Sequence, residues 1–297
     1  MSYPEWRRAL EEVVSAGLRE HRAAQVAAAL SAEAARVAKA PTRAPTAGPP
    51  APARTEPVPT DPLKLVVTSP VMGVDACAAG WVGVVLRPDL PPAVLVSATT
   101  AGLLDLARET GPVSVMAVDI PIGLPDDSAR LADALARAAV PGKGSSVFTT
   151  LTRAAYLAAS YEEARAANLA ATNGERSASA QAHALRGKIL EVDAWLRTEP
   201  AVEVIEVHPE VSFARIAGAP LATRKKDAAG AAERWTALAA VGFTAPPYYR
   251  GSGFAEDDLL DACAAAWTAA RYARGAAESL PPVPEVFSDG LAAAIRV

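Results

Sequence analysis

Four aspartates lie where carboxylates can do chemistry. Asp75 follows the apolar residues of VMGVD, and Asp119 follows those of VMAVD. The stretch EDDLLDA carries Asp258 and Asp261 three residues apart, which puts both on one face of a helix. Burying a carboxylate at a strand end is costly unless something pairs with it, and oxygen ligands suit Mg²⁺ or Mn²⁺. The pattern therefore predicts a metal site with the ligands Asp75, Asp119, Asp258 and Asp261.

The same aspartates allow a structural interpretation. Asp75 or Asp119 alone could cap a following turn by accepting backbone N–H bonds, and Asp258 could complement the dipole of a helix N-terminus. Asp261 fits that second explanation less well, because it lies deeper in the helix among leucines and alanines. Two metal ions held about 3.5 to 4 Å apart by such carboxylates can activate a water and stabilise the leaving oxygen in phosphodiester cleavage.

A second group of polar residues lies in VEVIEVHPEV. Strand alternation predicts that Glu206 and His208 point to one face, while Pro209 ends the strand. A histidine beside carboxylates could orient a water or join a metal shell; the alternative is a histidine satisfied by a neighbouring acid. We add Glu206 and His208 to the catalytic set.

The loop PGKGSSVF could bind an anion, because two glycines, Lys143, Ser145 and Ser146 can turn backbone N–H groups and a positive charge toward it. It is not a Walker A loop, since the lysine lies between the glycines and no strand leads directly into it. A plain flexible loop explains it equally well. The predicted substrate-binding residues are Lys143, Ser145, Ser146, Gln181, Lys188 and Lys225.

The surrounding pattern predicts the elements that position these residues. Three closely spaced strand-like segments, at 64–77, 80–88 and 93–100, indicate an antiparallel meander, and 114–125 and 201–210 are further strands. Helical periodicity covers 101–110, most of 128–197, 224–242 and 256–276. Strands that alternate with helices after a meander predict an α/β sheet covered on its faces.

The first 62 residues differ in composition from the rest. Residues 1–40 are rich in Ala, Glu and Arg and predict a helical extension, whereas 41–62 are rich in Pro, Ala and Thr and predict an extended linker. The folded domain is expected at 63–297. The extension could recruit a protein partner.

Composition narrows the classes of function. A formal charge of −4 and a pI near 5.5 give no global attraction to nucleic acid, so binding to nucleic acid or a nucleotide would need a local basic patch or a metal ion. Cys77 and Cys263 are isolated, which argues against a zinc site or a disulfide framework. Charges and prolines interrupt every long apolar run and we see no secretory signal, so we expect a cytoplasmic protein without a membrane span.

The order of the motifs resembles the DUF429 family of predicted RNase-H-like nucleases over roughly residues 70 to 275. The resemblance rests on GVDACAAGWV, VDIPIGLP, GKGSSVF, the segment ending KILEVD, EVHPEVSF, RKKDAAGAAER and DDLLDACAAAW. It implies an α/β, RNase-H-like fold with a mixed sheet, in which a three-strand antiparallel meander precedes parallel strands with flanking helices. Here that domain would follow an N-terminal helical extension.

The sequence is also similar to the Holliday-junction resolvase branch of that fold, in which a strand-one aspartate, a strand-four acid and a C-terminal helix pair bind the metals. By this resemblance Asp75 is the first acid, Asp119 the second, and Asp258 with Asp261 the helix pair. The turn after Asp75 departs from the family, because members often read Gly-Cys-Arg-Gly-Gly where this chain has Ala76-Cys77-Ala78-Ala79-Gly80.

Three hypotheses follow. The first is a nuclease or phosphodiesterase that depends on Mg²⁺ or Mn²⁺. The second is a nucleotide or small-phosphate hydrolase on the same fold, with GKGSSVF holding the phosphate. The third is a non-catalytic scaffold that recruits a partner through residues 1–40.

Overall fold

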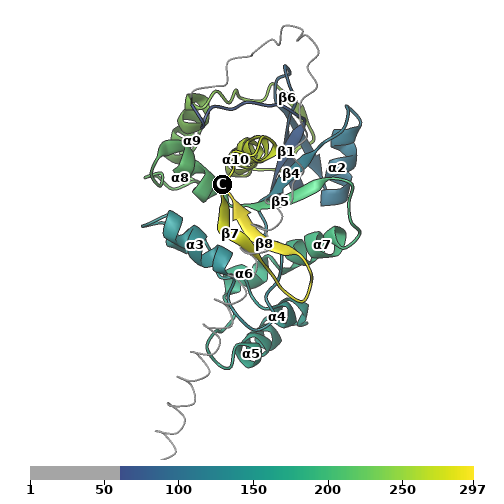
Figure 1. The fold of residues 1–297 in the computed structure, drawn as a ribbon, viewed down its shortest axis with the longest axis vertical. Helices are drawn as coiled ribbons and strands as arrows, with labels where there is room; N and C mark the ends of the chain where they lie inside the picture. Colours follow the sequence, from purple (N-terminus) through teal and green to yellow (C-terminus); the bar gives the residue numbers. More distant parts are fainter. Residues whose placement is uncertain (1–60) are drawn as a thin grey trace, which may run out of the picture. The chain divides into compact units, whose positions relative to one another are not determined.

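This structure, a computed structural model, describes residues 61–297. The predicted helical extension at 1–40, with its proposed partner, and all but the last two residues of the 41–62 linker lie outside the described residues. Within 61–297 one mixed sheet runs in the order β6-β3-β2-β1-β4-β5-β8-β7 (Figure 1). Its strands are β1 (Val71–Cys77), β2 (Gly80–Leu86), β3 (Ala93–Ser97), β4 (Val115–Val118), β5 (Glu203–Val207), β6 (Tyr248–Arg250), β7 (Ser279–Val286) and β8 (Ala292–Arg296).

The sheet has the predicted mixed pairing. Strands β1, β2 and β3 form an antiparallel meander, and β1, β4, β5 and β8 pair in parallel. The two edge strands reverse this arrangement. Strand β6 pairs in parallel with β3 of the meander, and β7 pairs antiparallel with β8 of the parallel part. A mixed α/β sheet with flanking helices is therefore confirmed.

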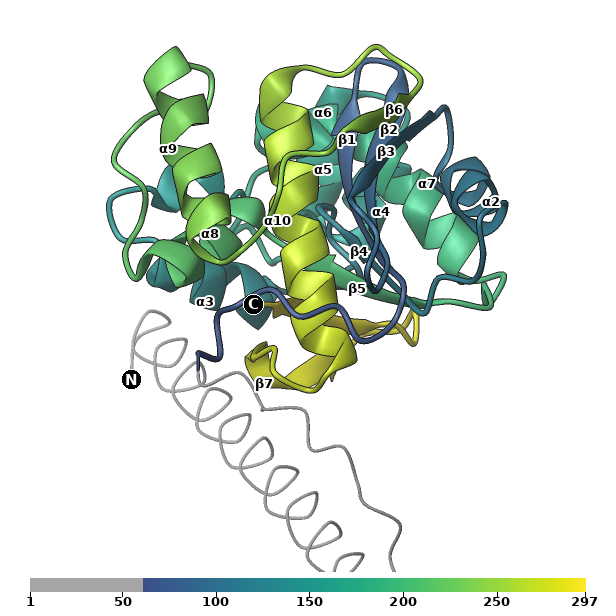
Figure 2. The ribbon, with the colours of Figure 1, turned by 90° about the horizontal axis from the view of Figure 1, so that it is seen from above.

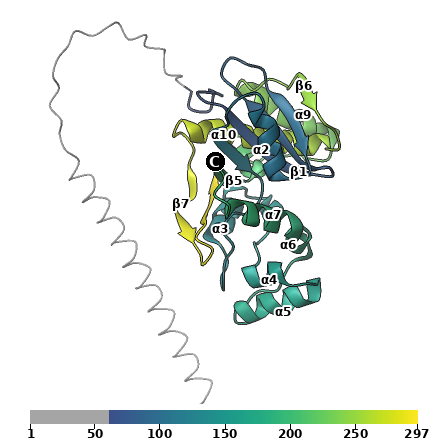
Figure 3. The same cartoon turned by 90° about the vertical axis from the view of Figure 1, so that its right-hand side faces the viewer.

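Helices cover both faces of this sheet (Figure 2). Helices α8, α9 and α10 lie on one side, and α2 and α7 on the other; α4 and α5 lie farther from the sheet (Figure 3). The helices are α2 (Thr100–Arg108), α3 (Leu131–Ala139), α4 (Arg153–Leu157), α5 (Tyr161–Ala171), α6 (Ala180–Ala184), α7 (Arg186–Leu196), α8 (Pro209–Ala217), α9 (Ala228–Ala240) and α10 (Glu256–Ala273).

The two-residue period of β1 decides which side of the sheet carries the site. Met72 and Val74 pack into the core beneath α2 and α7, whereas Val71 packs into the core beneath α10. Gly73 touches α10 directly: an ideal Cβ on it would lie 1.9 Å from the backbone nitrogen of Ala266. Asp75 is the next residue on this side, because alternate strand residues share a face.

Close packing of α10 on β1 explains the alanine content of this helix. All thirteen of its residues from Leu259 to Arg271 are buried, and six of them are alanines. Small side chains let the helix backbone approach a strand that has glycine at the crossing point, which no larger side chain would permit. The approach brings the first turns of α10 over the carboxyl end of β1.

Several elements differ from the sequence-based prediction. The sequence pattern did not predict β6, β7 or β8. Strand β7 carries three prolines in SLPPVPEV, and proline is compatible with a strand mainly at the edge of a sheet. The edge of the sheet is where β7 lies. The region 128–197 contains five short helices and a 3₁₀ turn at Gly144–Ser146. Among residues 61–297, no helix combines the length and apolar character needed to cross a membrane.

Candidate functional site

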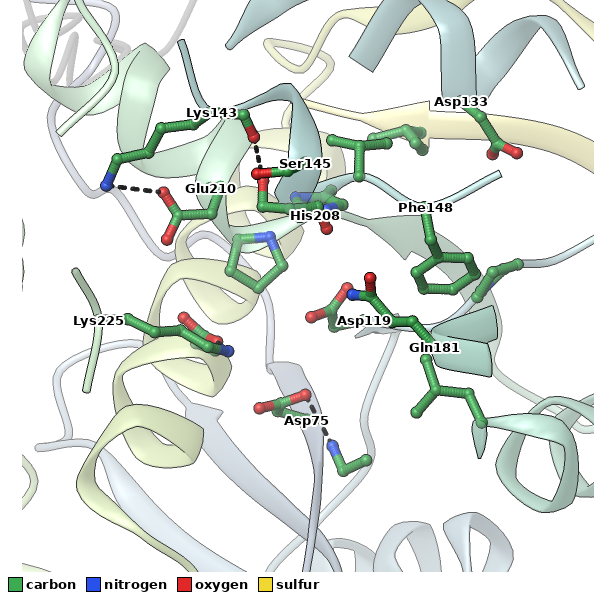
Figure 4. A pocket seen from close by; sticks show the side chains of 18 of the residues that line it. Asp75, Asp119, Asp133, Lys143, Ser145, Phe148, Gln181, His208, Glu210 and Lys225 are labelled. Carbon is green, nitrogen blue, oxygen red and sulfur yellow. Dashed lines mark hydrogen bonds and ion pairs between the residues drawn. The ribbon is translucent and has the colours of Figure 1, made fainter. Parts of the chain in front are cut away.

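A cavity of about 770 Å³ opens at the carboxyl ends of β1, β4 and β5 (Figure 4). Its lining comes from these strand ends, from α10, and from the loops around 143 and 225. Ligand sites in α/β sheets commonly lie outside the carboxyl ends of parallel strands. The predicted site residues that line it are Asp75, Asp119, Lys143, Ser145, Ser146, Gln181, His208, Lys225, Asp258 and Asp261.

Strand register brings the first two aspartates together. Val74 of β1 pairs with Val118 of β4, and the backbone N–H of Asp119 donates to the carbonyl of Val74 at 3.0 Å. Asp75 and Asp119 are therefore the next residues along two parallel neighbours, and they leave the sheet at the same level. Asp75 is 7% exposed, and its Oδ1 accepts the backbone N–H of Ala76 at 2.8 Å.

Helix α10 supplies the third carboxylate. Asp261 is 2% exposed, and its Oδ2 accepts from the Lys225 ammonium at 2.7 Å. Its other oxygen, Oδ1, is buried without a hydrogen-bond partner. Asp258 lies one turn nearer the helix start, at the cavity wall, where its Oδ2 accepts the backbone N–H of Ala255 at 2.8 Å. Asp261 is thus the inner acid of the helix pair and Asp258 the outer one.

The three inner carboxylates disfavour one another's charge. Burial, followed by the charges of Asp119 and Asp261, raises the pKa of Asp75 well above its usual range. Burial also raises the pKa of Asp119, although His208 and Lys225 act in the opposite direction. Burial raises the pKa of Asp261 to about 6 against the opposing effect of Lys225. Such mutual repulsion is what a bound cation would relieve.

The donor set suits a hard divalent cation. Carboxylate oxygens are the ligands that Mg²⁺ and Mn²⁺ prefer, and the buried, unpartnered Oδ1 of Asp261 is free to coordinate. Among residues 61–297, no group of three or more His, Cys, Asp or Glu side chains has the spacing of a formed metal site. The Lys225 ammonium instead lies on Asp261, and its charge acts on Asp75 and Asp119 as well.

His208 lies just after β5 and lines the cavity. Its Nε2 is 3.3 Å from the carbonyl oxygen of Ser146. Because a carbonyl only accepts, this contact requires a proton on Nε2, which leaves the Nδ1 lone pair of the neutral ring without a donor. Nδ1 is buried and has no hydrogen-bond partner. His208 therefore lines the cavity with one ring nitrogen engaged and the other buried without a partner.

Glu206 has a different position from the one proposed for it. In the parallel register Glu206 pairs with Val118, whose side chain packs in the core on the side away from α10. Its carboxylate accepts two bonds of 2.7 Å from Arg130 and one of 2.8 Å from the N–H of Ile122. Glu206 is outside the cavity lining, and it lies on the opposite face of the sheet from Asp75 and Asp119.

Lys188 also lies outside the cavity lining. It donates to the carbonyl of Gly80 at 2.7 Å, and its ammonium lies 4.5 Å from the centre of the Trp81 ring. These contacts fasten α7 to the β1–β2 turn. Within this turn Ala78 is exposed and is not part of the cavity wall.

Several donors of the 143–146 loop that could bind an anion already form hydrogen bonds within the protein. The backbone N–H of Lys143 donates to the Val140 carbonyl, and both the N–H and Oγ of Ser146 donate to the Lys143 carbonyl. The Lys143 ammonium donates to the Thr223 carbonyl and lies 3.8 Å from Glu210. Ser145 and Gln181 are exposed cavity residues. The loop therefore closes the cavity toward the segment that carries Lys225.

Three charged cavity residues were absent from the predicted site: Asp133, Glu210 and Arg224. Asp133 is engaged, because it accepts from the N–H and hydroxyl of Thr150. Glu210 forms an ion pair with the buried Arg234. Of the three, only Arg224 is an exposed, positively charged residue at the rim, and the sequence signal for it was its place in the RKK run.

An α/β protein with an acidic cavity at the carboxyl ends of parallel strands is the class that this geometry defines. Comparison with family models then matches residues 73–286 to "Protein of unknown function (DUF429)", so the chain belongs to the DUF429 family. The match contains every carboxylate that lines the cavity. Searches of curated proteins and of solved structures gave no match.

Proposed function

We propose that this chain is a metal-dependent phosphodiesterase of RNase-H-like fold that acts on nucleic acid. The strand order β3-β2-β1-β4-β5, antiparallel in the first three strands and parallel afterwards, supports the fold. So does the source of the acids: Asp75 from β1, Asp119 from the end of β4, and Asp261 from the helix packed on β1.

One observation carries the proposal. Asp75, Asp119 and Asp261 come from three separate elements and meet in one cavity, where burial raises all three pKa values and the charge of Asp119 raises those of Asp75 and Asp261 further. Buried like charges destabilise a fold, so their assembly needs a functional reason. A divalent cation supplies that reason, because it favours the ionised form of all three.

The chain's own residues can be assigned roles. Asp75, Asp119 and Asp261 would hold the cation, with Asp258 at the outer wall. Bound Mg²⁺ or Mn²⁺ would lower the pKa of a water and stabilise charge on the phosphate oxygens. His208 Nδ1 is suited to accept the proton of the attacking water, since Nε2 is fixed on Ser146.

Purified protein tested with Mg²⁺ and Mn²⁺ on single-stranded DNA, single-stranded RNA, duplexes and branched junctions would check this function. We expect cleavage that EDTA abolishes and Asp119→Asn reduces at least 100-fold without loss of fold by circular dichroism. Equal activity of wild type and Asp119→Asn would assign any cleavage to a contaminant. A wild type inactive on every phosphodiester would overturn the proposal.

A nucleotide or small-phosphate hydrolase is the second candidate, favoured by the size of the cavity. About 770 Å³ lies within the roughly 300 to 1,000 Å³ typical of small-molecule sites. The lining also contains Phe148 and Gln181, which could contact a base, beside the positive groups of Lys143 and Arg224. Turnover of mononucleotides with none of the polymers, measured by phosphate release, would favour this candidate.

A further inference from the structure

Lys225 lies where a cation is needed. Its ammonium contacts Asp261 Oδ2 at 2.7 Å, and its charge also acts on Asp75 and Asp119. It comes from the loop between α8 and α9, not from any element that carries the acids. A lysine in this place supplies positive charge that partly balances the negative charge of the carboxylates.

The loop that carries Lys225 is fastened on both sides. Glu233 of α9 accepts from the backbone N–H groups of Ala222 and Thr223 at 3.0 Å each. On the other side Gly230 lies against the loop, since an ideal Cβ there would be 1.8 Å from the carbonyl oxygen of Arg224. The loop backbone is therefore held in position, and the long Lys225 side chain reaches the acids from a fixed base.

The neutralisation by Lys225 is incomplete. One ammonium serves three buried carboxylates, and Asp261 Oδ1 stays without a partner. The Lys225 side chain is also 39% exposed, compared with 3% for that of Asp261, so it has an open path to the cavity rim. A divalent cation carries twice the charge and can bind several carboxylates at once, which a single ammonium cannot.

We propose that Lys225 is an internal counter-ion that holds the acidic cluster together until a divalent cation binds, and that the cation displaces its ammonium from Asp261 toward the rim beside Arg224. This inference rests on the proposed function, because it takes the cluster to be a Mg²⁺ or Mn²⁺ site. At the rim the released ammonium joins Arg224 as a positive group for a substrate phosphate. Metal binding would thus also prepare the substrate site.

Mn²⁺ binding to the full chain tests the competition directly, by the loss of the free Mn²⁺ signal in electron paramagnetic resonance. Lys225→Met removes the competing charge, and we expect at least tenfold tighter Mn²⁺ binding than in wild type. Lys225→Arg keeps the charge and should bind within about threefold of wild type. Lys226→Met is the matched control, because it removes the same charge from an exposed neighbour and should change the affinity less than threefold.

The outcomes separate the two proposals. Wild type that binds Mn²⁺ with the same affinity as Lys225→Met, or tighter, would overturn the counter-ion role and leave the proposed metal site intact. Absence of binding in both proteins would overturn the metal dependence itself. Tight binding by Lys225→Met alone would support both proposals.

Chemical labelling of wild type provides a test without a substitution. Acetylation with a limiting amount of acetic anhydride, read by mass spectrometry, reports the accessibility of each lysine amine. Saturating Mg²⁺ should increase acetylation of Lys225 at least threefold relative to that of Lys226. An unchanged ratio under saturating Mg²⁺ would show that the ammonium stays on Asp261 and would overturn the displacement.

Discussion

Buried carboxylates on the two faces of the central strands differ in how their charges are balanced. On one face Glu206 of β5 meets Arg130, with two bonds of 2.7 Å, and the N–H of Ile122. On the other face Asp75 and Asp119 lie one residue beyond the level of Glu206 and share a cavity with Asp261, which forms an ion pair with Lys225. Both carboxylate oxygens of Glu206 accept hydrogen bonds, whereas Oδ1 of Asp261 has no hydrogen-bond partner.

This difference separates a structural acid from functional ones. A buried charge whose hydrogen bonds are all made fixes the packing around it, whereas removing its partner is strongly destabilising. Buried charges that repel one another lower the stability of the fold. Such groups occur at functional sites, where a bound ligand can compensate the repulsion. The comparison therefore predicts opposite effects of similar substitutions on the two faces.

The largest effect should follow Asp75→Asn on the cavity face. We expect kcat/KM for phosphodiester cleavage to fall at least 10³-fold, about 4 kcal/mol of transition-state stabilisation, because a cation ligand is lost. The melting temperature should stay equal or rise, because the substitution relieves repulsion with Asp119 and Asp261.

Calorimetry and steady-state kinetics on the same preparation measure both quantities, and Asp127→Asn, at an exposed aspartate, serves as the control. If Asp75→Asn lost stability together with activity, the Asp75 charge would be structural and the contrast between the faces would fail.

On the opposite face Arg130→Met should lower the free energy of unfolding by about 3 kcal/mol, because it leaves the buried carboxyl of Glu206 without its main partner. Urea denaturation measures this change. The double variant Arg130→Met/Glu206→Gln should recover part of the loss.

The surface pair formed by Arg250 and Glu109 provides the control, since both side chains are more than half exposed. Arg250→Met should cost less than about 1 kcal/mol. If Arg130→Met and Arg250→Met lowered the free energy of unfolding equally, the buried pair would contribute no more to stability than a surface pair.

The pH dependence of stability should report the unsatisfied cluster. Burial raises the pKa of Asp261 from 3.8 to about 6, so the folded protein binds this proton more tightly than the unfolded chain does. The stability that Asp261 contributes is therefore present below pH 4 and is lost as the pH rises through 6, by up to about 3 kcal/mol.

Urea denaturation of wild type and Asp261→Asn from pH 4 to 8, without divalent cations, isolates this effect. The variant should gain stability relative to wild type over that range, and the difference should level off above pH 7. Addition of Mg²⁺ should reduce the difference. A difference that did not change with pH would contradict the raised pKa.

The smallest effect is expected for Lys188→Met, which tests whether this lysine belongs to the structural set. Its contacts with Gly80 and Trp81 predict a loss of stability of about 1 kcal/mol and kcat/KM within twofold of wild type. A tenfold loss of activity would return Lys188 to the substrate-binding group.

The sequence by itself determined which acids meet. Each of Asp75 and Asp119 follows an apolar strand, and parallel neighbours bring their carboxyl ends to one edge. The helical period put Asp258 and Asp261 on one face. The meander, the helices that carry these residues and the DUF429 membership could all be read locally, because each depends on the pattern within a short segment.

Only the tertiary structure decided how each charge is balanced. Arg130 and Glu206 are 76 residues apart, and Lys225 and Asp261 are 36 apart, so no local pattern predicts these pairs. The alternation in VEVIEVHPE placed Glu206 and His208 on one face, but strand register turned Glu206 away from the acids and the chain left the strand before His208. A local sequence pattern fixes the direction of a side chain within its own element, whereas its counter-ion is set by which distant elements pack together.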